Sequence, residues 1–399
     1  MRHVRPVIAL GLAVLALHCS DATGPSVFDR YLELAPRSVL LFEGDTLRLT
    51  AQVFDTLGNA LPQAGVTFES RDTTLVRTAP REGGRGTRLT GVLSGSTYVV
   101  ARSGSARDSA LVTVVITRSA VAGVPFGAAI SPSGAAYVTL PWANRLARAT
   151  LPNTSFLSDV SLGDLPSDVQ FNRVGTRAYV SDQYSQSIAV VDVTTGSWVD
   201  TIPVTGDAFK VLVAPGDSIL WVTTNADSVY AIRLATHAVV ARLATGAAAN
   251  GFAARDSMVW VSTRAGGTVL EVNAKTYTIN RTFVIGGYPQ ELIVSPHGDQ
   301  LYIANEAGSV QTLDLASGTV VSTIPLPGGG GFAMARNPAN GLLYVSTGYF
   351  SSTVWVIDPA TPTIVRRIIT GGVPRRIAFN AAGTVGIVAN EANWVDFIR

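Results

Sequence analysis

The sequence predicts an all-β fold made of two parts, a small β-sandwich followed by a ring of repeated four-stranded units. Two observations predict it. Short runs of alternating apolar and polar residues are separated by turn-forming residues, which is typical of antiparallel strands. In addition, successive copies of a four-residue cassette lie 42, 42, 39, 42, 42 and 43 residues apart, beginning at Tyr137, Tyr179, Trp221, Trp260, Tyr302, Tyr344 and Ile387. A fixed period of this size indicates a repeat architecture.

The composition describes a globular chain of more than one domain. Of the 399 residues, 47% are hydrophobic and 15% are charged, which favours packed cores over disorder. The net charge is only +2. No cluster of basic residues has the density that nucleic-acid binding requires, so we expect no nucleic-acid partner. The densest basic stretch is Arg366–Arg367 with Arg375–Arg376, and we expect these side chains to be solvated at strand ends.

The first 18 residues have the pattern of a secretory signal peptide. Arg2 and Arg5 precede an apolar run, Val7–Leu17, which is too short to span a bilayer stably. A small, polar linker, residues 19–29, follows. We therefore expect the mature protein to be exported, either to the cell envelope (lipid-anchored, periplasmic or at the cell surface) or as a secreted protein.

Cys19, the only cysteine of the chain, stands directly after the apolar run. This arrangement resembles the cleavage site of bacterial lipoproteins, and the resemblance implies that Cys19 becomes the lipidated first residue. Such a lipid would be the protein's only membrane contact. The alternative is ordinary cleavage after Ala22, with Ser20 and Ala22 as the small residues of the site.

Residues 30–116 are predicted to form a small antiparallel sandwich. Apolar and polar residues alternate in Leu47–Val53, Val66–Glu69 and Leu111–Val115, with turn residues between the runs. Seven or so such runs within this stretch predict an immunoglobulin-like sandwich.

This stretch resembles the bacterial Ig-like group 2 domain. The matching segments are Leu34–Val39, Glu43–Leu47, Val53–Asn59, Val66–Ser70 and Thr90–Gly95. The resemblance implies a spacer or an adhesive module of a surface protein, and we favour the spacer.

Residues 117–399 contain seven copies of one strand pattern. Each copy begins with a lead-in loop that contains glycine or proline, for example Gly163–Pro166 or Gly286–Pro289. An apolar strand, a tight turn, the cassette strand, a third strand and a fourth strand follow. Four strands per unit and a period near forty residues predict a seven-bladed β-propeller.

The cassettes, such as Tyr-Val-Ser-Asp at 179–182 and Tyr-Ile-Ala-Asn at 302–305, resemble the YVTN-type propeller repeat of bacterial and archaeal cell-surface proteins. The resemblance extends over residues 117–399. It implies the propeller fold and a place at the cell surface, and it implies no particular activity.

The seventh unit ends with the chain after its third strand. The segment Ile116–Ala122, which precedes the first lead-in loop, has the pattern of the missing fourth strand. Pairing the two would close the ring and leave that unit without a bare edge. The linker to the sandwich would then be very short, or one long strand would serve both domains.

Two sets of loops, the lead-in loops and the loops after the cassettes, share one face of such a ring, which we call the loop face. The residues there that could contact a ligand are Trp142, Asp182, Tyr184, Arg264, Asn305, Glu306, Tyr349, Asn390 and Glu391. Aromatic rings beside carboxylates and amides suit a sugar, a peptide or another partly apolar ligand. The loops of the first, second and sixth units are longer and aromatic, so a specific partner is expected near them. Solvated scaffold loops are the alternative.

We therefore predict a non-catalytic binding or scaffold protein, in which the spacer presents the loop face to a protein or polysaccharide of the envelope. We expect a monomer without a metal or cofactor. His237 and His297, the only histidines after the leader, lie in different units and away from the loop face. The alternative function is an extracytoplasmic, carboxylate-dependent hydrolase or lactonase, for which Glu306 and Glu391 form the best acid–base pair.

Overall fold

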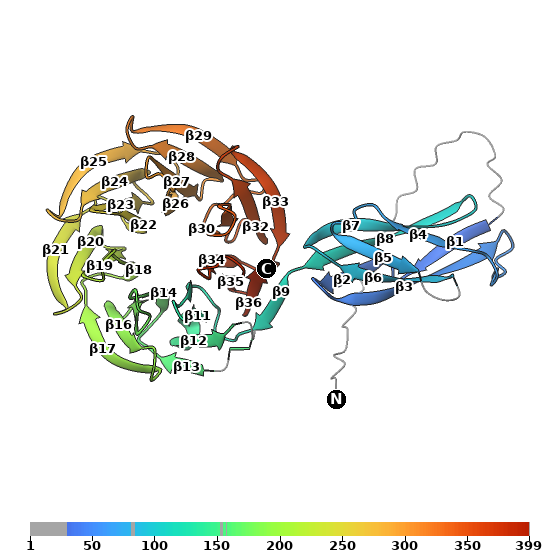
Figure 1. Cartoon of the computed structure of the whole chain (residues 1–399), viewed down its shortest axis with the longest axis horizontal. Helices are drawn as coiled ribbons and strands as arrows, with labels where there is room; N and C mark the ends of the chain where they lie inside the picture. The colour runs from blue at the N-terminus through green and yellow to red at the C-terminus, as the bar shows by residue number, and fades with distance from the viewer. Residues whose placement is uncertain (1–29, 81–83, 152–154, 157, 399) are drawn as a thin grey trace.

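A computed structural model describes residues 30–80, 84–151, 155–156 and 158–398, which fold almost entirely into β-strands (Figure 1). The proposed signal peptide, linker, Cys19 and Ala22 lie outside these residues. Within the described part, the only helix is the 3-10 turn η1 (Pro141–Ala143), and no helix is long and apolar enough to cross a membrane.

The N-terminal domain consists of two four-stranded sheets. One has the order β1 (Arg30–Ala35), β3 (Thr46–Asp55), β6 (Gly86–Gly91), β5 (Val76–Pro80); the other has the order β2 (Ser38–Phe42), β8 (Ala106–Val115), β7 (Gly95–Ser103), β4 (Thr67–Ser70). Only β2 and β8 pair in parallel among these strands. Alternate residues of both sheets, such as Leu49 and Val112, are fully buried in one shared core. The predicted alternation of apolar and polar residues thus places one face of each sheet inward.

Seven four-stranded sheets follow among the described residues and form a ring (Figure 1). We call each sheet a blade. Blade 1 contains β10 (Ala128–Ile130), β11 (Ala135–Leu140), β12 (Arg145–Thr150) and β13 (Ser158–Ser161); blade 2 contains β14 (Pro166–Phe171), β15 (Arg177–Asp182), β16 (Ser187–Asp192) and β17 (Ser197–Pro203). Blade 3 contains β18 (Ala208–Val213), β19 (Ile219–Thr224), β20 (Ser228–Arg233) and β21 (Ala238–Ala244); blade 4 contains β22 (Ala249–Arg255), β23 (Met258–Thr263), β24 (Thr268–Asn273) and β25 (Thr278–Val284).

Blade 5 contains β26 (Pro289–Val294), β27 (Gln300–Asn305), β28 (Ser309–Asp314) and β29 (Thr319–Pro325); blade 6 contains β30 (Ala333–Arg336), β31 (Leu343–Ser346), β32 (Thr353–Asp358) and β33 (Thr363–Ile369). Blade 7 contains β34 (Pro374–Phe379), β35 (Gly386–Asn390), β36 (Trp394–Ile398) and β9 (Thr117–Ala120). The first strand of each blade lines the centre of the ring, and the fourth lies at the rim (Figure 1).

The predicted closure of the ring is confirmed. Strand β9 pairs antiparallel with β36, with Ala120 opposite Trp394 and Thr117 opposite Phe397. A strand from the beginning of the ring therefore completes blade 7. Because β9 covers β36, the third strand of that blade has no exposed edge.

The cassette residues build the contacts between blades. The first residue of every copy is buried and packs against the following blade, as Trp221 does against Phe252 and Val261. Tyr137, Tyr179, Trp260, Tyr302, Tyr344 and Ile387 take the same place in the other clusters. The first residue of each cassette therefore joins neighbouring blades.

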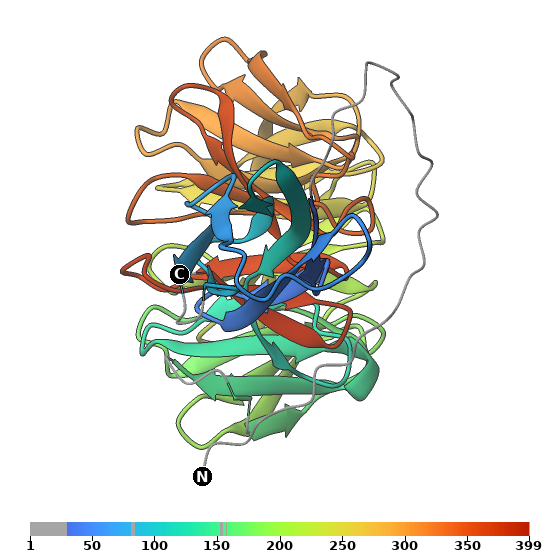
Figure 2. The same ribbon diagram turned by 90° about the vertical axis from the view of Figure 1, so that its right-hand side faces the viewer.

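The N-terminal domain packs against the rim of the ring, beside β9 and β33 (Figures 1 and 2). Only Ile116 separates β8 from β9, and this residue is buried in the core between blades 6 and 7. Across the interface, Arg366 Nη2 lies 3.1 Å from Glu43 Oε1 and donates a hydrogen bond to Ser94 Oγ. The guanidinium of Arg118 lies 5.5 Å from the ring centre of Phe42. The very short linker is thus confirmed, and Arg366, expected to be solvated, instead joins the two domains.

Candidate functional site

Five large aromatic side chains are exposed on loops of the loop face. Their exposed fractions are 76% for Trp142, 65% for Tyr184, 49% for Tyr288, 70% for Tyr349 and 53% for Phe350. Four belong to loops after the cassettes, where they were expected. Tyr288 was missed as a candidate, although its place in the lead-in loop Gly286–Pro289 is visible in the sequence. Exposed aromatic rings gathered on one face are typical of an interaction site.

The loop of Trp142 is held in place by its neighbours. Asn144 ends the turn η1 in the left-handed conformation, which asparagine tolerates better than most residues. Its side chain then binds the next lead-in loop, because Nδ2 donates to Asp164 Oδ1 at 2.8 Å and Oδ1 accepts from the Leu165 amide at 3.2 Å. Blades 1 and 2 thereby fix the turn from which Trp142 projects.

A pocket of about 190 Å³ opens on the loop face between blades 1, 2, 6 and 7. Its aromatic and apolar residues include Trp142, Tyr349 and Phe126. Its polar residues are Ser167, Gln183, Arg375 and Glu391. Three of the nine predicted site residues, Trp142, Tyr349 and Glu391, therefore line one pocket. The pocket also touches blades 1, 2 and 6, the units whose loops were expected to carry a partner.

Arg375 forms part of the wall of this pocket, and its charge is neutralised. Its Nε donates to Glu391 Oε1 at 2.8 Å. The guanidinium carbon lies 4.0 Å from the ring centre of Tyr349, 4.4 Å from that of Phe332 and 5.2 Å from that of Phe126. Arg375 is 5% exposed, so the expectation of a solvated side chain is wrong. An ion pair among three aromatic rings gives the pocket directed hydrogen-bonding groups without a net charge.

A second ion pair lies at blades 4 and 5, apart from the pocket. Both Nε and Nη2 of Arg264 lie 2.7 Å from Glu306 Oε2, which also accepts from Gln290 Nε2 at 2.7 Å. Arg264 in turn stacks over Tyr288, 5.1 Å from its ring centre. Glu306 and Glu391, the predicted acid–base pair, therefore belong to blades 5 and 7, and each is bound by its own arginine.

Three predicted site residues lie beneath the loop face rather than on it. Asp182, Asn305 and Asn390, at the fourth cassette position, are at most 2% exposed. Asn305 Oδ1 accepts from the amides of Tyr288 (2.8 Å) and Ala307 (3.1 Å), and its Nδ2 donates to Gly286 O. Asn390 binds Val373 N and Gly371 O in the same way. These side chains attach the lead-in loop to the cassette loop, so they support the face and are not placed to contact a ligand.

Charged residues at the centre of the ring were also missed. Lys210 Nζ lies 2.7 Å from Glu291 Oε2, which also accepts a hydrogen bond from Arg376 Nη1. Asp168 lies near both cations, and burial raises its pKa although Lys210 and Arg376 oppose this shift. All four are at most 8% exposed, which again contradicts the solvated placement expected for Arg376. The available signal was a charged residue at the third position of β14, β18, β26 and β34, the first strands of their blades.

Histidine and carboxylate groups do not converge on a metal site in the described part of the chain, where no cluster of three or more His, Cys, Asp and Glu side chains occurs. His237 Nδ1 lies 2.9 Å from Asp200 Oδ2 on the outer strands, and His297 lies on a turn opposite the loop face.

Comparison with known proteins supports the fold and goes no further. No protein-family model matches the chain, and no curated protein matches it. Among solved structures, hydrazine synthase of Kuenenia stuttgartiensis is similar with a TM-score of 0.63 and 16% identity, over 71% of this chain and 97% of that one. A chain of the mitotic checkpoint complex is similar with a TM-score of 0.64 and 12% identity, over 71% of this chain and 90% of that one. The ring of four-stranded sheets and these likenesses identify the chain as a β-propeller protein.

Proposed function

We propose that the protein is a non-catalytic binding protein of the cell envelope, whose loop face holds a polysaccharide. The observation that carries the proposal is the pocket flanked by Trp142 and Tyr349. Exposed aromatic rings offer flat apolar surfaces to the C–H faces of a sugar, while Gln183, Ser167 and the Arg375–Glu391 pair offer hydrogen bonds to hydroxyl groups. Because the two charges are paired, the pocket suits a neutral sugar better than a charged one.

The N-terminal domain is proposed to be an Ig-like spacer. Its two sheets enclose one core, and it meets the ring through Ile116 and the Arg366–Glu43 ion pair. A spacer joined in this way holds the loop face in a constant orientation relative to the N-terminal domain. The proposed attachment is a lipid on Cys19, and it rests on the N-terminal sequence alone.

Removal of the two exposed rings tests the binding proposal. We expect the double variant Trp142→Ala/Tyr349→Ala to bind envelope polysaccharide roughly 5- to 150-fold more weakly, since each stacked ring contributes about 0.5–1.5 kcal/mol. The measurement is a glycan array followed by titration calorimetry on the full chain. Trp198→Ala is the matched control, because it removes an exposed tryptophan from the outer strand β17.

Two results would contradict this proposal. One is that no glycan or envelope polysaccharide binds the folded protein. The other is that the double variant and the Trp198→Ala control bind equally well. Capture of an envelope protein that the double variant fails to capture would replace the polysaccharide by a protein partner.

Replacement of Cys19 tests the anchor. Cys19→Ser is expected to move the protein from the membrane fraction to the soluble fraction after cell fractionation, because the thiol that would carry the lipid is gone. Unchanged partitioning would contradict lipidation, and detection of a mature N-terminus at residue 23 would show cleavage after Ala22.

A further inference from the structure

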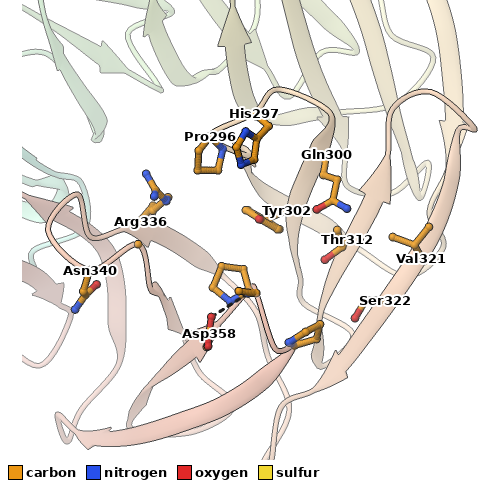
Figure 3. Close-up of a pocket in the computed structure, with 14 residues that line it drawn as sticks. Pro296, His297, Gln300, Tyr302, Thr312, Val321, Ser322, Arg336, Asn340 and Asp358 are labelled. Carbon is orange, nitrogen blue, oxygen red and sulfur yellow. Dashed lines mark hydrogen bonds between the residues drawn. The ribbon is translucent and has the colours of Figure 1, made fainter.

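A second concave site lies on the face opposite the loop face, between blades 5 and 6. It is a groove of about 530 Å³ (Figure 3). Blade 5 contributes the turn after β26 and residues of β27, β28 and β29, and blade 6 contributes the ends of β30 and β32 with the turns that follow them. Figure 3 shows Tyr302 near the middle of the groove, with Arg336 on one side and Gln300 and Thr312 on the other.

The polar side chains of this groove have unused hydrogen-bonding capacity. Gln300, Thr312 and Tyr302 donate and accept no side-chain hydrogen bond within the described chain, although Thr312 is only 8% exposed and Tyr302 only 6%. The polar groups of the loop-face pocket differ, because Arg375, Glu391, Gln183 and Ser167 each already make a hydrogen bond to one another or to the backbone, and only their remaining donors and acceptors are open to a ligand. Polar groups that line a concave site and have no partner in the protein favour a ligand that supplies one.

Arg336 is the cation of the groove, and it has no acceptor among the described residues. It is half-buried, and its Nε is shielded from solvent without a hydrogen-bond partner. The nearby carboxylate of Asp358 is occupied by its own turn, accepting from Ala360 N and Thr361 Oγ1 at 2.9 Å each. An unpaired guanidinium in a concave site suits a carboxylate, which its planar fork binds well.

We propose that this groove binds a saccharide that carries a carboxylate, the chemistry of a uronic acid. Arg336 takes the carboxylate, Gln300 and Thr312 take ring hydroxyl groups, and the prolines Pro296 and Pro359 contribute apolar lining. An acidic peptide fits less well, because one arginine would leave further carboxylates unpaired beside Asp358. The site is separate from the loop face and does not rest on the function proposed for that face.

The test is titration calorimetry of the full chain with galacturonate and glucuronate oligosaccharides, with neutral galactose oligosaccharides and with a glutamate peptide. We expect a uronate to bind and the other two probes to bind at least tenfold more weakly. Arg336→Met keeps the length of the side chain and removes its charge, and it should weaken uronate binding about tenfold or more. Thr312→Val should weaken it less.

Three controls make the result specific. Arg233→Met removes an exposed arginine of blade 3 and should leave binding unchanged. Trp142→Ala/Tyr349→Ala should also leave it unchanged, so failure at one face is distinguishable from failure at the other. Thermal melting of each variant shows that it is folded. Absence of uronate binding, or equal binding by folded Arg336→Met, overturns the proposal; equal binding of the glutamate peptide overturns the saccharide class.

Discussion

Asp182 shows how one residue alters a repeated position. At the equivalent sites, Asn305 and Asn390 both accept and donate hydrogen bonds within the lead-in loop. Asp182 Oδ2 accepts from Gly163 N at 3.1 Å, while its Oδ1 is buried without a partner in the described structure. Burial raises the pKa of Asp182 to about 7, partly offset by the Gly163 hydrogen bond. The carboxylate form is therefore disfavoured in the folded protein.

We predict that Asp182→Asn stabilises the protein above pH 7. A raised pKa means that the folded state binds the proton more tightly than the unfolded state. The stabilisation by the protonated form is thus complete below about pH 4 and lost as the pH rises through about 7. The variant avoids this loss, so its gain in unfolding free energy should be on the order of 2–4 kcal/mol at pH 8 and small at pH 4.

Urea unfolding of wild type and variant at the two pH values measures this gain. The other buried carboxylates of the described chain, Asp168, Glu291 and Asp396, are present in both proteins, so the difference isolates Asp182. An equal gain at pH 4 and pH 8 would mean that the amide acts through its hydrogen bonds and not through the missing charge.

At the scale of elements, a hydroxyl at the third cassette position connects neighbouring blades. Ser262 Oγ accepts from Gly251 N at 2.7 Å in its own blade and donates to Gln290 O of blade 5 at 2.7 Å. Thr139, Ser181 and Thr223 make the same two bonds in blades 1 to 3. In blade 4 the first strand is irregular here, and a side chain at Gly251 would clash with Gln290 O. The small residue of the cassette is thus needed where two blades meet.

Ser262→Ala is predicted to lower the unfolding free energy by about 1–3 kcal/mol, because it leaves a buried amide and a buried carbonyl without partners. Denaturant unfolding measures the change. Ser197→Ala, at an exposed position of β17 without a side-chain hydrogen bond, is the control and should be close to neutral. A loss no larger than that of the control would show that the bridge does not stabilise the ring.

At the scale of the whole molecule, blade 7 links the ends of the ring and the N-terminal domain. Arg118 of β9 donates to Thr370 O at 2.8 Å, stacks over Trp394 at 4.3 Å and lies 3.4 Å from Asp396 Oδ1. The same side chain contacts Phe42 of the N-terminal domain. Strand β9 therefore both closes the ring and attaches the N-terminal domain to it.

Removal of that strand is predicted to destabilise the ring. A chain of residues 123–399 should melt at least roughly 5 °C below a chain of residues 117–399, since β36 loses its neighbour and becomes an exposed edge. Thermal unfolding followed by circular dichroism compares the two chains, which differ only in residues 117–122. Equal melting temperatures would mean that the strand pairing observed here adds nothing to stability.

Much of the fold could be predicted because its signals are local. The four-stranded units and the closing strand Ile116–Ala122 follow from strand patterns that repeat along the chain, and the structure places both as expected. The exposed Trp142, Tyr184 and Tyr349 were found for the same reason, since a loop after a cassette strand must reach the same face in every blade.

The sequence by itself determined the ring, its closure and the loops that could carry a ligand; the tertiary structure decided which polar residues are exposed. Asp182 and Asn305 are as polar as Tyr184 or Glu391, and only the path of the lead-in loop covers them. Glu291 meets Lys210 and Arg376 from positions 81 and 85 residues away, and Arg336 faces a groove made by two blades. The repeated third position of the first strands marks Lys210, Glu291 and Arg376 in the sequence, but which charges pair and how deeply they are buried depends on contacts that exist only once the ring has closed.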